Sequence, residues 1–176
     1  MRKKKNHHFE TKVIHAGQKS DPTTGAVMTP IVLASTFEQS SPGVHKGYDY
    51  SRSINPTREA FENCIADLEN GYKGYGFSSG VAAISACVEL LSPGDHIIAM
   101  DDLYGGSVRL FNEIKSLSQG IEISYVDMTD TNNIKNAIKA STKMIFVETP
   151  TNPLLKIADL SKIAKLAKKE KILTVL

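Results

Sequence analysis

Apolar positions along the last two thirds of the chain follow two alternating spacings. Short continuous apolar runs predict strands at 74–78, 96–100, 121–127, 144–149 and 172–176. Between them, apolar residues recur every three or four positions, which predicts helices at about 79–91, 105–117, 131–140 and 159–169. Strands that alternate with helices form βαβ units. We therefore expect an α/β fold with a mostly parallel, doubly wound sheet.

The beginning of the chain lacks such a pattern. Glycines and prolines interrupt each incipient element up to about Pro56. Irregular segments of this length are uncommon inside compact domains, so we interpret residues 1–55 as an extended arm that contacts a neighbouring subunit or is functional in its own right. Pro56 suits the first turn of a helix, and Gly71 lies just past its expected end. Residues 56–176 then form the sheet-containing domain.

Composition and charge suggest no macromolecular partner. The chain has 176 residues, 41% hydrophobic and 23% charged, with a net charge of +2, which does not favour nucleic-acid binding. The basic run Arg2 to Lys5 is interpreted as a solvated tail. No apolar run approaches the roughly 18 residues that a membrane span needs. We expect a cytoplasmic protein with no nucleic-acid or membrane partner.

Cysteine and histidine positions give no metal-binding pattern. Cys64 and Cys87 lie in helical patterns without a CxxC pair, so both are expected to be reduced thiols. His7 and His8 are adjacent instead of spaced along one helix face, and the other three histidines are scattered. We expect no metal.

The turn "FSSGVAAI" places Ser78, Ser79 and Gly80 between a predicted strand and a predicted helix. Ligands of parallel sheets bind at such turns, and the free N–H groups of a helix N-terminus favour a phosphate. The alternative is an N-cap serine before a tightly packed helix, and the turn alone favours that alternative. A nucleotide-binding Rossmann domain is a further alternative, but Gly74, Gly76 and Gly80 do not match the dinucleotide fingerprint.

Two other strand ends favour a ligand site. "MDDLYGGSVRLF" places Asp101, Asp102 and Tyr104 after one strand, and "VETPTNP" places Glu148, Thr149 and Asn152 after another. Because the carboxyl ends of parallel strands share one edge of the sheet, these groups should converge with the serine turn. Anion donors, an aromatic ring, an acid and an amide suit a planar, phosphorylated, aromatic cofactor.

Six segments, in this order, carry a resemblance to a known family: "TKVIHAGQ", "GAVMTPIVLASTFEQ", "YDYSRSINPTREAFE", "FSSGVAAI", "MDDLYGGSVRLF" and "VETPTNPLLKIADL". The chain resembles, over essentially its whole length, the pyridoxal-phosphate-dependent enzymes of Cys/Met metabolism, which include the cystathionine lyases and γ-synthases and methionine γ-lyase. The resemblance implies the large domain of a fold-type I pyridoxal-phosphate-dependent transferase. It also implies pyridoxal 5′-phosphate as cofactor, a sulfur-containing amino acid as substrate, and a homotetramer built as a dimer of dimers.

The resemblance assigns a role to the serine turn and to the tyrosine that follows the next strand. Backbone N–H groups of Gly80 and Val81, with Ser79 beside them, are expected to hold the cofactor phosphate. Tyr104 is expected to stack on the pyridine ring and to assist proton movement or orient the substrate amine.

Four further residues receive roles from the same resemblance. Tyr50 and Arg52 are expected to reach the phosphate of the neighbouring subunit's cofactor, an apt pairing because arginine binds phosphate bidentately. Tyr50 is a second candidate catalytic residue. Glu148 is expected to contact residues that bind the cofactor, without touching the cofactor itself. Asn152 is expected to contact a cofactor oxygen.

The chain ends before two features that the resemblance implies. An aspartate facing the pyridine nitrogen and the Schiff-base lysine should follow "KILTVL". We therefore expect a truncated transsulfuration enzyme, a carbon–sulfur lyase or related transferase, that is inactive alone; the alternative is a non-catalytic fragment or a complementing subunit of a split enzyme. Lys143 precedes a predicted strand and is interpreted as an ordinary loop lysine. Gly106, where methionine γ-lyases carry cysteine, favours the cystathionine enzymes and leaves β- or γ-chemistry open.

Overall fold

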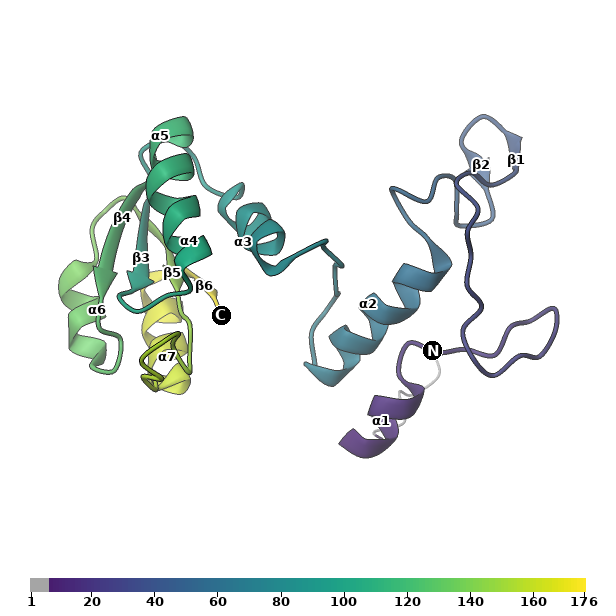
Figure 1. Cartoon of the computed structure of the whole chain (residues 1–176), viewed down its shortest axis with the longest axis horizontal. Helices are drawn as coiled ribbons and strands as arrows, with labels where there is room; N and C mark the ends of the chain where they lie inside the picture. The colour runs from purple at the N-terminus through teal and green to yellow at the C-terminus, as the bar shows by residue number, and fades with distance from the viewer. Residues whose placement is uncertain (1–6) are drawn as a thin grey trace. The chain divides into compact units, whose positions relative to one another are not determined.

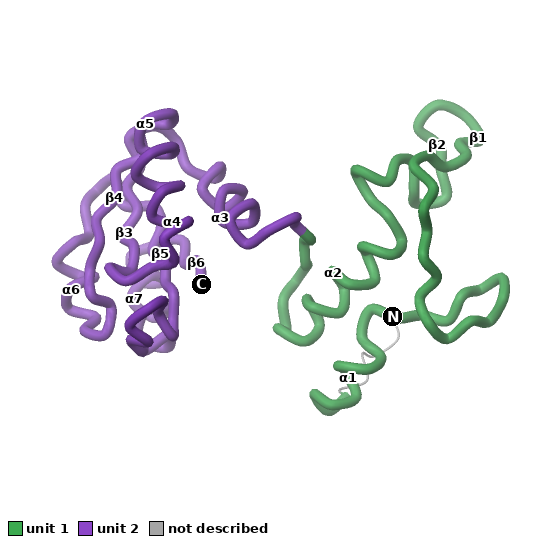
Figure 2. The backbone as a smooth tube through the Cα atoms, viewed as in Figure 1, with its two compact units in different colours: residues 1–76 green, residues 77–176 purple. Residues whose placement is uncertain are grey.

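The computed structural model describes residues 7–176 and divides the chain into two compact units, Met1–Gly76 and Phe77–Leu176 (Figure 2). Each unit is described by itself. The predicted role of residues 1–55 as an arm that contacts another subunit stays a prediction. The first compact unit extends about twenty residues beyond that segment, because the long helix that begins at Pro56 packs with it.

The second unit contains a four-stranded parallel sheet (Figure 1). Its strands, in spatial order, are β4 (Glu122–Val126), β3 (His96–Met100), β5 (Thr142–Phe146) and β6 (Leu173–Val175). Its helical segments are α3 (Gly80–Val88), α4 (Gly105–Arg109), the π-helical turn η1 (Leu110–Lys115), α5 (Ser116–Gln119), α6 (Thr131–Ala137) and α7 (Leu160–Glu170). All four helices and four of the five strands predicted from the sequence pattern are present.

Strand order places helices on both faces of this sheet. After β3 the chain crosses to β4, at one edge of the sheet. The next two connections, from β4 to β5 and from β5 to β6, run toward the opposite edge. Because parallel crossovers are right-handed, α4 to α5 cover one face while α6 and α7 cover the opposite face, where they contact each other (Figure 1). The sheet is therefore doubly wound, as expected.

The core of the second unit lies between the sheet and these helices. All five residues of β3 are buried, which is typical of a central parallel strand. Phe111 on η1 packs edge-on against Phe146 of β5, with ring centroids 5.1 Å apart. Side-chain caps fix the helix starts: the Asp159 carboxylate, for example, accepts a hydrogen bond from Lys162 N–H at the start of α7.

Between residues 7 and 76, the first unit holds two helices and a small hairpin. These are α1 (Phe9–His15), α2 (Pro56–Leu68), and the antiparallel strands β1 (Gln39–Ser41) and β2 (Val44–His45). The Asn55 side chain caps α2 by accepting hydrogen bonds from two of its first N–H groups. α1 packs on α2, where Lys12 donates to the Asp67 carbonyl at 3.1 Å. The sequence pattern predicted neither α1 nor the hairpin, because both are short and lack a buried face.

The first unit buries very little apolar surface. Among residues 7–76, Ala16 is the one buried apolar side chain. Large apolar side chains of the segment between the helices are instead open to solvent, Leu33 at 91% exposure and Ile31 at 80%. Exposed apolar surface of this kind marks interaction sites in soluble proteins.

Two predicted strand positions were wrong. Residues 74–78 form no strand, since Gly74 lies against the backbone of α2 and the Gly76 N–H donates to the Glu62 carboxylate instead of to a strand. The strand expected at 144–149 begins at Thr142 and ends at Phe146. Lys143 accordingly lies within β5, near its amino end, and not in the loop before it.

Within residues 7–176, no helix has both the length and the apolarity needed to cross a membrane.

His96, the first residue of β3, should make the stability of the second unit depend on pH. It is fully buried, and its two ring nitrogens lie 2.8 Å from Thr142 Oγ1 and 2.9 Å from Ser124 Oγ. Burial lowers the pKa of His96, with Lys139 adding to this effect and Glu122 opposing it.

Because the folded pKa is lowered, the contribution of His96 to stability is complete above about pH 6.5 and is lost as the pH falls below that value. The unfolding free energy should fall with a slope of at most about 1.4 kcal/mol per pH unit for this one proton. Urea unfolding of the wild type and of His96→Gln between pH 7.5 and 5.5 measures the difference. Equal pH slopes for the two proteins would contradict the prediction.

Candidate functional site

The carboxyl ends of β3 and β5 lie at the point where the sheet changes direction. These strands are neighbours, yet the helix that follows β3 and the helix that follows β5 lie on opposite faces. The two outgoing loops therefore diverge, and ligands of open α/β sheets bind in the crevice between such loops. Three of the residues expected to form the site lie in the segments after these two strands: Tyr104 after β3, and Glu148 and Asn152 after β5.

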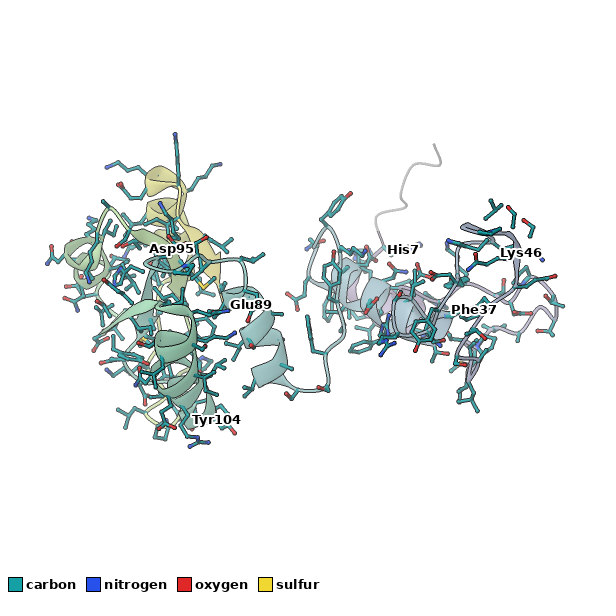
Figure 3. The ribbon with its side chains drawn as sticks, turned by 90° about the horizontal axis from the view of Figure 1, so that it is seen from above. His7, Phe37, Lys46, Glu89, Asp95 and Tyr104 are labelled. Carbon is teal, nitrogen blue, oxygen red and sulfur yellow. The ribbon has the colours of Figure 1, made fainter. Side chains whose placement is uncertain are left out.

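Tyr104 and Glu148 come together across this switch point. The backbone N–H of Tyr104, at the start of α4, donates to Glu148 Oε2 at 3.1 Å. The Tyr104 side chain is half exposed and lies at the surface of the second unit (Figure 3). Its ring lies over Gly106, where an added Cβ would be 2.4 Å from Tyr104 Cε1. Gly106 therefore leaves the space that the aromatic ring occupies.

Asp102 fastens the loop after β5 to the end of β3. Its Oδ2 accepts a hydrogen bond from Thr151 Oγ1 at 2.5 Å and another from Leu154 N–H at 2.9 Å. Thr151 is buried and also accepts from Lys156 N–H at 2.8 Å. Asn152 lies between these anchored positions and is itself exposed. The anchoring fixes the backbone on both sides of Asn152.

Lys156 ties three strand ends together. Its ammonium lies 2.8 Å from the Asp101 carboxylate, after β3, and 3.0 Å from the Asp127 carboxylate, after β4. Hydrogen bonds from Thr129, with Lys156 adding to them, lower the pKa of Asp127 to about 2. The Asp127–Lys156 pair is therefore ionised throughout the neutral range, since the pKa of Lys156 is raised by Asp101 and Asp127, and the three side chains hold the switch-point loops in place.

The N-terminus of α3 offers hydrogen-bond donors. Ser79 caps the helix, since its Oγ accepts from Ala82 N–H at 3.1 Å, which confirms the capping alternative without excluding the phosphate one. Within residues 7–176, the N–H groups of Gly80 and Val81 have no acceptor. Space around Gly80 is open, with no atom within 4 Å of the position that a Cβ would take. Two free N–H groups at an open, positive helix end fit the phosphate of pyridoxal 5′-phosphate.

Tyr50 and Arg52 belong to the first unit. The Arg52 guanidinium lies 4.9 Å from the centroid of the Tyr50 ring, and both residues are exposed. Tyr50 also forms an isolated β-bridge with Thr36. The structure thus places the two side chains beside each other on one surface, where both are open to a neighbouring molecule.

Sequence reasoning missed the anchoring residues Thr151 and Lys156. Thr151 pairs with Asp102, which is 49 positions away, and Lys156 pairs with Asp101 and Asp127 at separations of 55 and 29. A threonine and a lysine have no spacing signal that would identify such distant partners. The aspartates, in contrast, could have been identified from the sequence, because they lie directly after predicted strands.

Comparison with known proteins identifies one family. The model of the family described as Cys/Met metabolism PLP-dependent enzyme matches residues 10–176. A cystathionine beta-lyase of Coxiella burnetii is 58% identical over 171 residues, 97% of this chain and 44% of the relative. A cystathionine gamma-lyase of Bacillus subtilis is 46% identical over 166 residues, 94% of this chain and 44% of the relative.

Solved structures show the same likeness. The crystal structure of cystathionine gamma-lyase from Lactobacillus plantarum complexed with L-serine has a TM-score of 0.92 and 47% identity, over 96% of this chain and 44% of that one. This likeness confirms the expected α/β fold of the pyridoxal-phosphate enzymes. The chain spans less than half the length of these relatives. With the family model matched from residue 10 to residue 176, the chain belongs to the Cys/Met metabolism PLP-dependent enzymes.

Proposed function

We propose that this chain forms the phosphate-binding and ring-binding side of a pyridoxal-phosphate-dependent carbon–sulfur lyase that acts on cystathionine or a related sulfur-containing amino acid. The observation that carries the proposal is the pair of free N–H groups of Gly80 and Val81, at an open helix N-terminus, in a chain of this family. The names of the relatives, which are cystathionine lyases, support the substrate class.

Each residue of the second unit has a defined task in this proposal. Gly80 and Val81 bind the phosphate through their backbone, and Ser79 adds a hydroxyl that can donate while its oxygen caps the helix. Tyr104 covers the ring and orients the substrate amine, and Glu148 holds the start of α4, from which Tyr104 projects. Asn152 contacts a cofactor oxygen from the anchored loop. The bound cofactor supplies an electron sink for the carbanion that precedes loss of the sulfur substituent.

The first unit is proposed to serve a neighbouring copy of the chain. Its exposed apolar segment and the exposed Tyr50 and Arg52 pair support an arm that covers another subunit and reaches the cofactor phosphate bound there. The assembly is then a homo-oligomer, a dimer of dimers, in the cytoplasm, without a nucleic-acid or membrane partner.

A chimera tests the proposed activity. This chain replaces the matching 44% of the Coxiella burnetii cystathionine beta-lyase, and the relative supplies the rest. The purified chimera should bind pyridoxal 5′-phosphate and cleave cystathionine with one water. The products of β-elimination are homocysteine, pyruvate and ammonia, and those of γ-elimination are cysteine, 2-oxobutanoate and ammonia. A folded oligomeric chimera that bound the cofactor but cleaved no sulfur amino acid would refute the proposed reaction.

Arg52 should contribute to phosphate binding between subunits. Arg52→Ala in the chimera should raise the dissociation constant for pyridoxal 5′-phosphate about tenfold, because a hydrogen bond to a charged group contributes about 1.5–3 kcal/mol and the lower end of that range corresponds to a factor of about ten. Lys73→Ala is the matched control, since Lys73 is another cation, 4.8 Å from the centroid of the Tyr75 ring. Equal effects of the two substitutions in a fluorescence titration would count against a specific role for Arg52.

A further inference from the structure

Arg58, on the first turns of α2, makes a forked contact with the turn that carries Arg52. Its Nη1 donates to the Ser51 carbonyl at 3.1 Å, and its Nη2 donates to the Ser53 carbonyl at 2.7 Å. These two carbonyls flank Arg52 on either side. A planar guanidinium can hold two acceptors in fixed directions, which an ammonium group cannot do.

Glu62, one turn further along α2, holds the Arg58 guanidinium through its Nε atom. Its Oε1 accepts from Arg58 Nε at 3.2 Å and from the Gly76 N–H at 2.8 Å. The Glu62 side chain is 14% exposed, so solvent screens this pair less than a surface pair. One ion pair thus holds both the turn around Arg52 and the segment ending at Gly76 against the same helix.

The side chain of Arg52 itself has no comparable anchor. Its guanidinium stacks on Tyr50. Besides Arg58, the backbone of the turn is held by the N–H groups of Ser53 and Ile54, which both donate to the Tyr50 carbonyl, and by Ser51, whose N–H donates to the Ser35 carbonyl. An exposed arginine loses considerable conformational freedom on binding a phosphate, so a fixed backbone beneath it reduces that cost.

We infer that Arg58 is a positioning residue for Arg52: its guanidinium fixes the backbone on both sides of Arg52 and so directs Arg52 toward a phosphate group. The inference rests on the phosphate-binding role proposed for Arg52 above. Arg58 itself touches backbone and Glu62 and is assigned no contact with the cofactor.

Arg58→Lys tests the inference in the 176-residue chain because it keeps the positive charge and removes the fork. Amide hydrogen exchange at Ser53 and Ile54 should become about tenfold faster, while exchange in the middle of α2 should be unchanged. In the chimera that carries the same substitution, titration with pyridoxal 5′-phosphate, followed by fluorescence, should show a several-fold loss of affinity. The double variant Arg52→Ala/Arg58→Lys should bind no more weakly than Arg52→Ala alone, because two residues that act through one contact are not additive.

Each outcome supports or overturns a distinct statement. Unchanged exchange at Ser53 and Ile54 overturns the inference, and so does an additive double variant. If Arg52→Ala has no effect on affinity, the proposed role of Arg52 fails, and the positioning role fails with it. Should Arg58→Lys also release the middle of α2, Glu62→Gln replaces it: this variant keeps an acceptor oxygen but removes the charge, and faster exchange at Ser53 is again the expected result.

Discussion

Replacement of Gly80 with aspartate should weaken binding of pyridoxal 5′-phosphate about 100-fold without loss of protein stability. The added side chain meets no atom within 4 Å of its Cβ position, so it causes no steric strain. A carboxylate in the first turn of a helix is favourable, by about 0.3–1 kcal/mol. The same carboxylate would stand beside the bound phosphate. Like charges about 4 Å apart repel by about 4 kcal/mol near a protein surface, and salt screens part of this repulsion. A loss of affinity of about 100-fold corresponds to about 2.8 kcal/mol, which is below that limit.

Gly80→Asn is the matched control for this prediction. It has the same shape as aspartate and lacks the charge, so it should weaken binding only slightly. Fluorescence titration gives the dissociation constants, and urea unfolding gives the stabilities. Equal affinity for the aspartate and asparagine variants would mean that no phosphate binds near Gly80.

Replacement of Asp102 with alanine should lower the unfolding free energy of the second unit by about 2–4 kcal/mol. The substitution leaves the buried Thr151 hydroxyl and the Leu154 N–H without their acceptor. An unsatisfied buried polar group such as the Thr151 hydroxyl costs about 1–3 kcal/mol, and loss of the part-buried Leu154 hydrogen bond adds about 1 kcal/mol. The loop that carries Asn152 should loosen as well, which hydrogen exchange at Leu154 and Lys156 would detect.

Asp102→Asn separates the hydrogen bonds from the charge. Asparagine keeps one acceptor oxygen, so it should lose about 1 kcal/mol, clearly less than alanine. If the alanine and asparagine variants unfolded at the same denaturant concentration, the anchoring role of Asp102 would be refuted.

Periodicity predicted the second unit well because its elements bury one side. β3 is buried throughout, and α7 presents Ile163 and Ala167 to the core. Short elements without a buried face, such as α1 and the hairpin, leave no periodic trace and were missed. The strand expected at 74–78 failed for a different reason: its apolar and glycine pattern reflects packing against α2, and a single sequence does not distinguish that packing from strand pairing.

The site, like the fold, was only partly predictable from the sequence. Residues directly after strands, such as Tyr104 and Glu148, could be predicted because the sheet topology brings strand ends together, and the structure joins these two by a hydrogen bond. The residues that hold the site in shape could not be predicted. Lys156 and Arg58 act through partners that only the folded chain brings near them, at positions without a spacing rule.

Amide NMR of the ¹⁵N-labelled chain, titrated with pyridoxal 5′-phosphate and separately with pyridoxal, tests the central claim most directly. The account predicts that the phosphorylated compound shifts the Gly80 and Val81 amide signals, that unphosphorylated pyridoxal leaves them in place, and that Gly80→Asp abolishes the effect. Shifts confined to other residues, with Gly80 and Val81 unmoved at saturation, would contradict it.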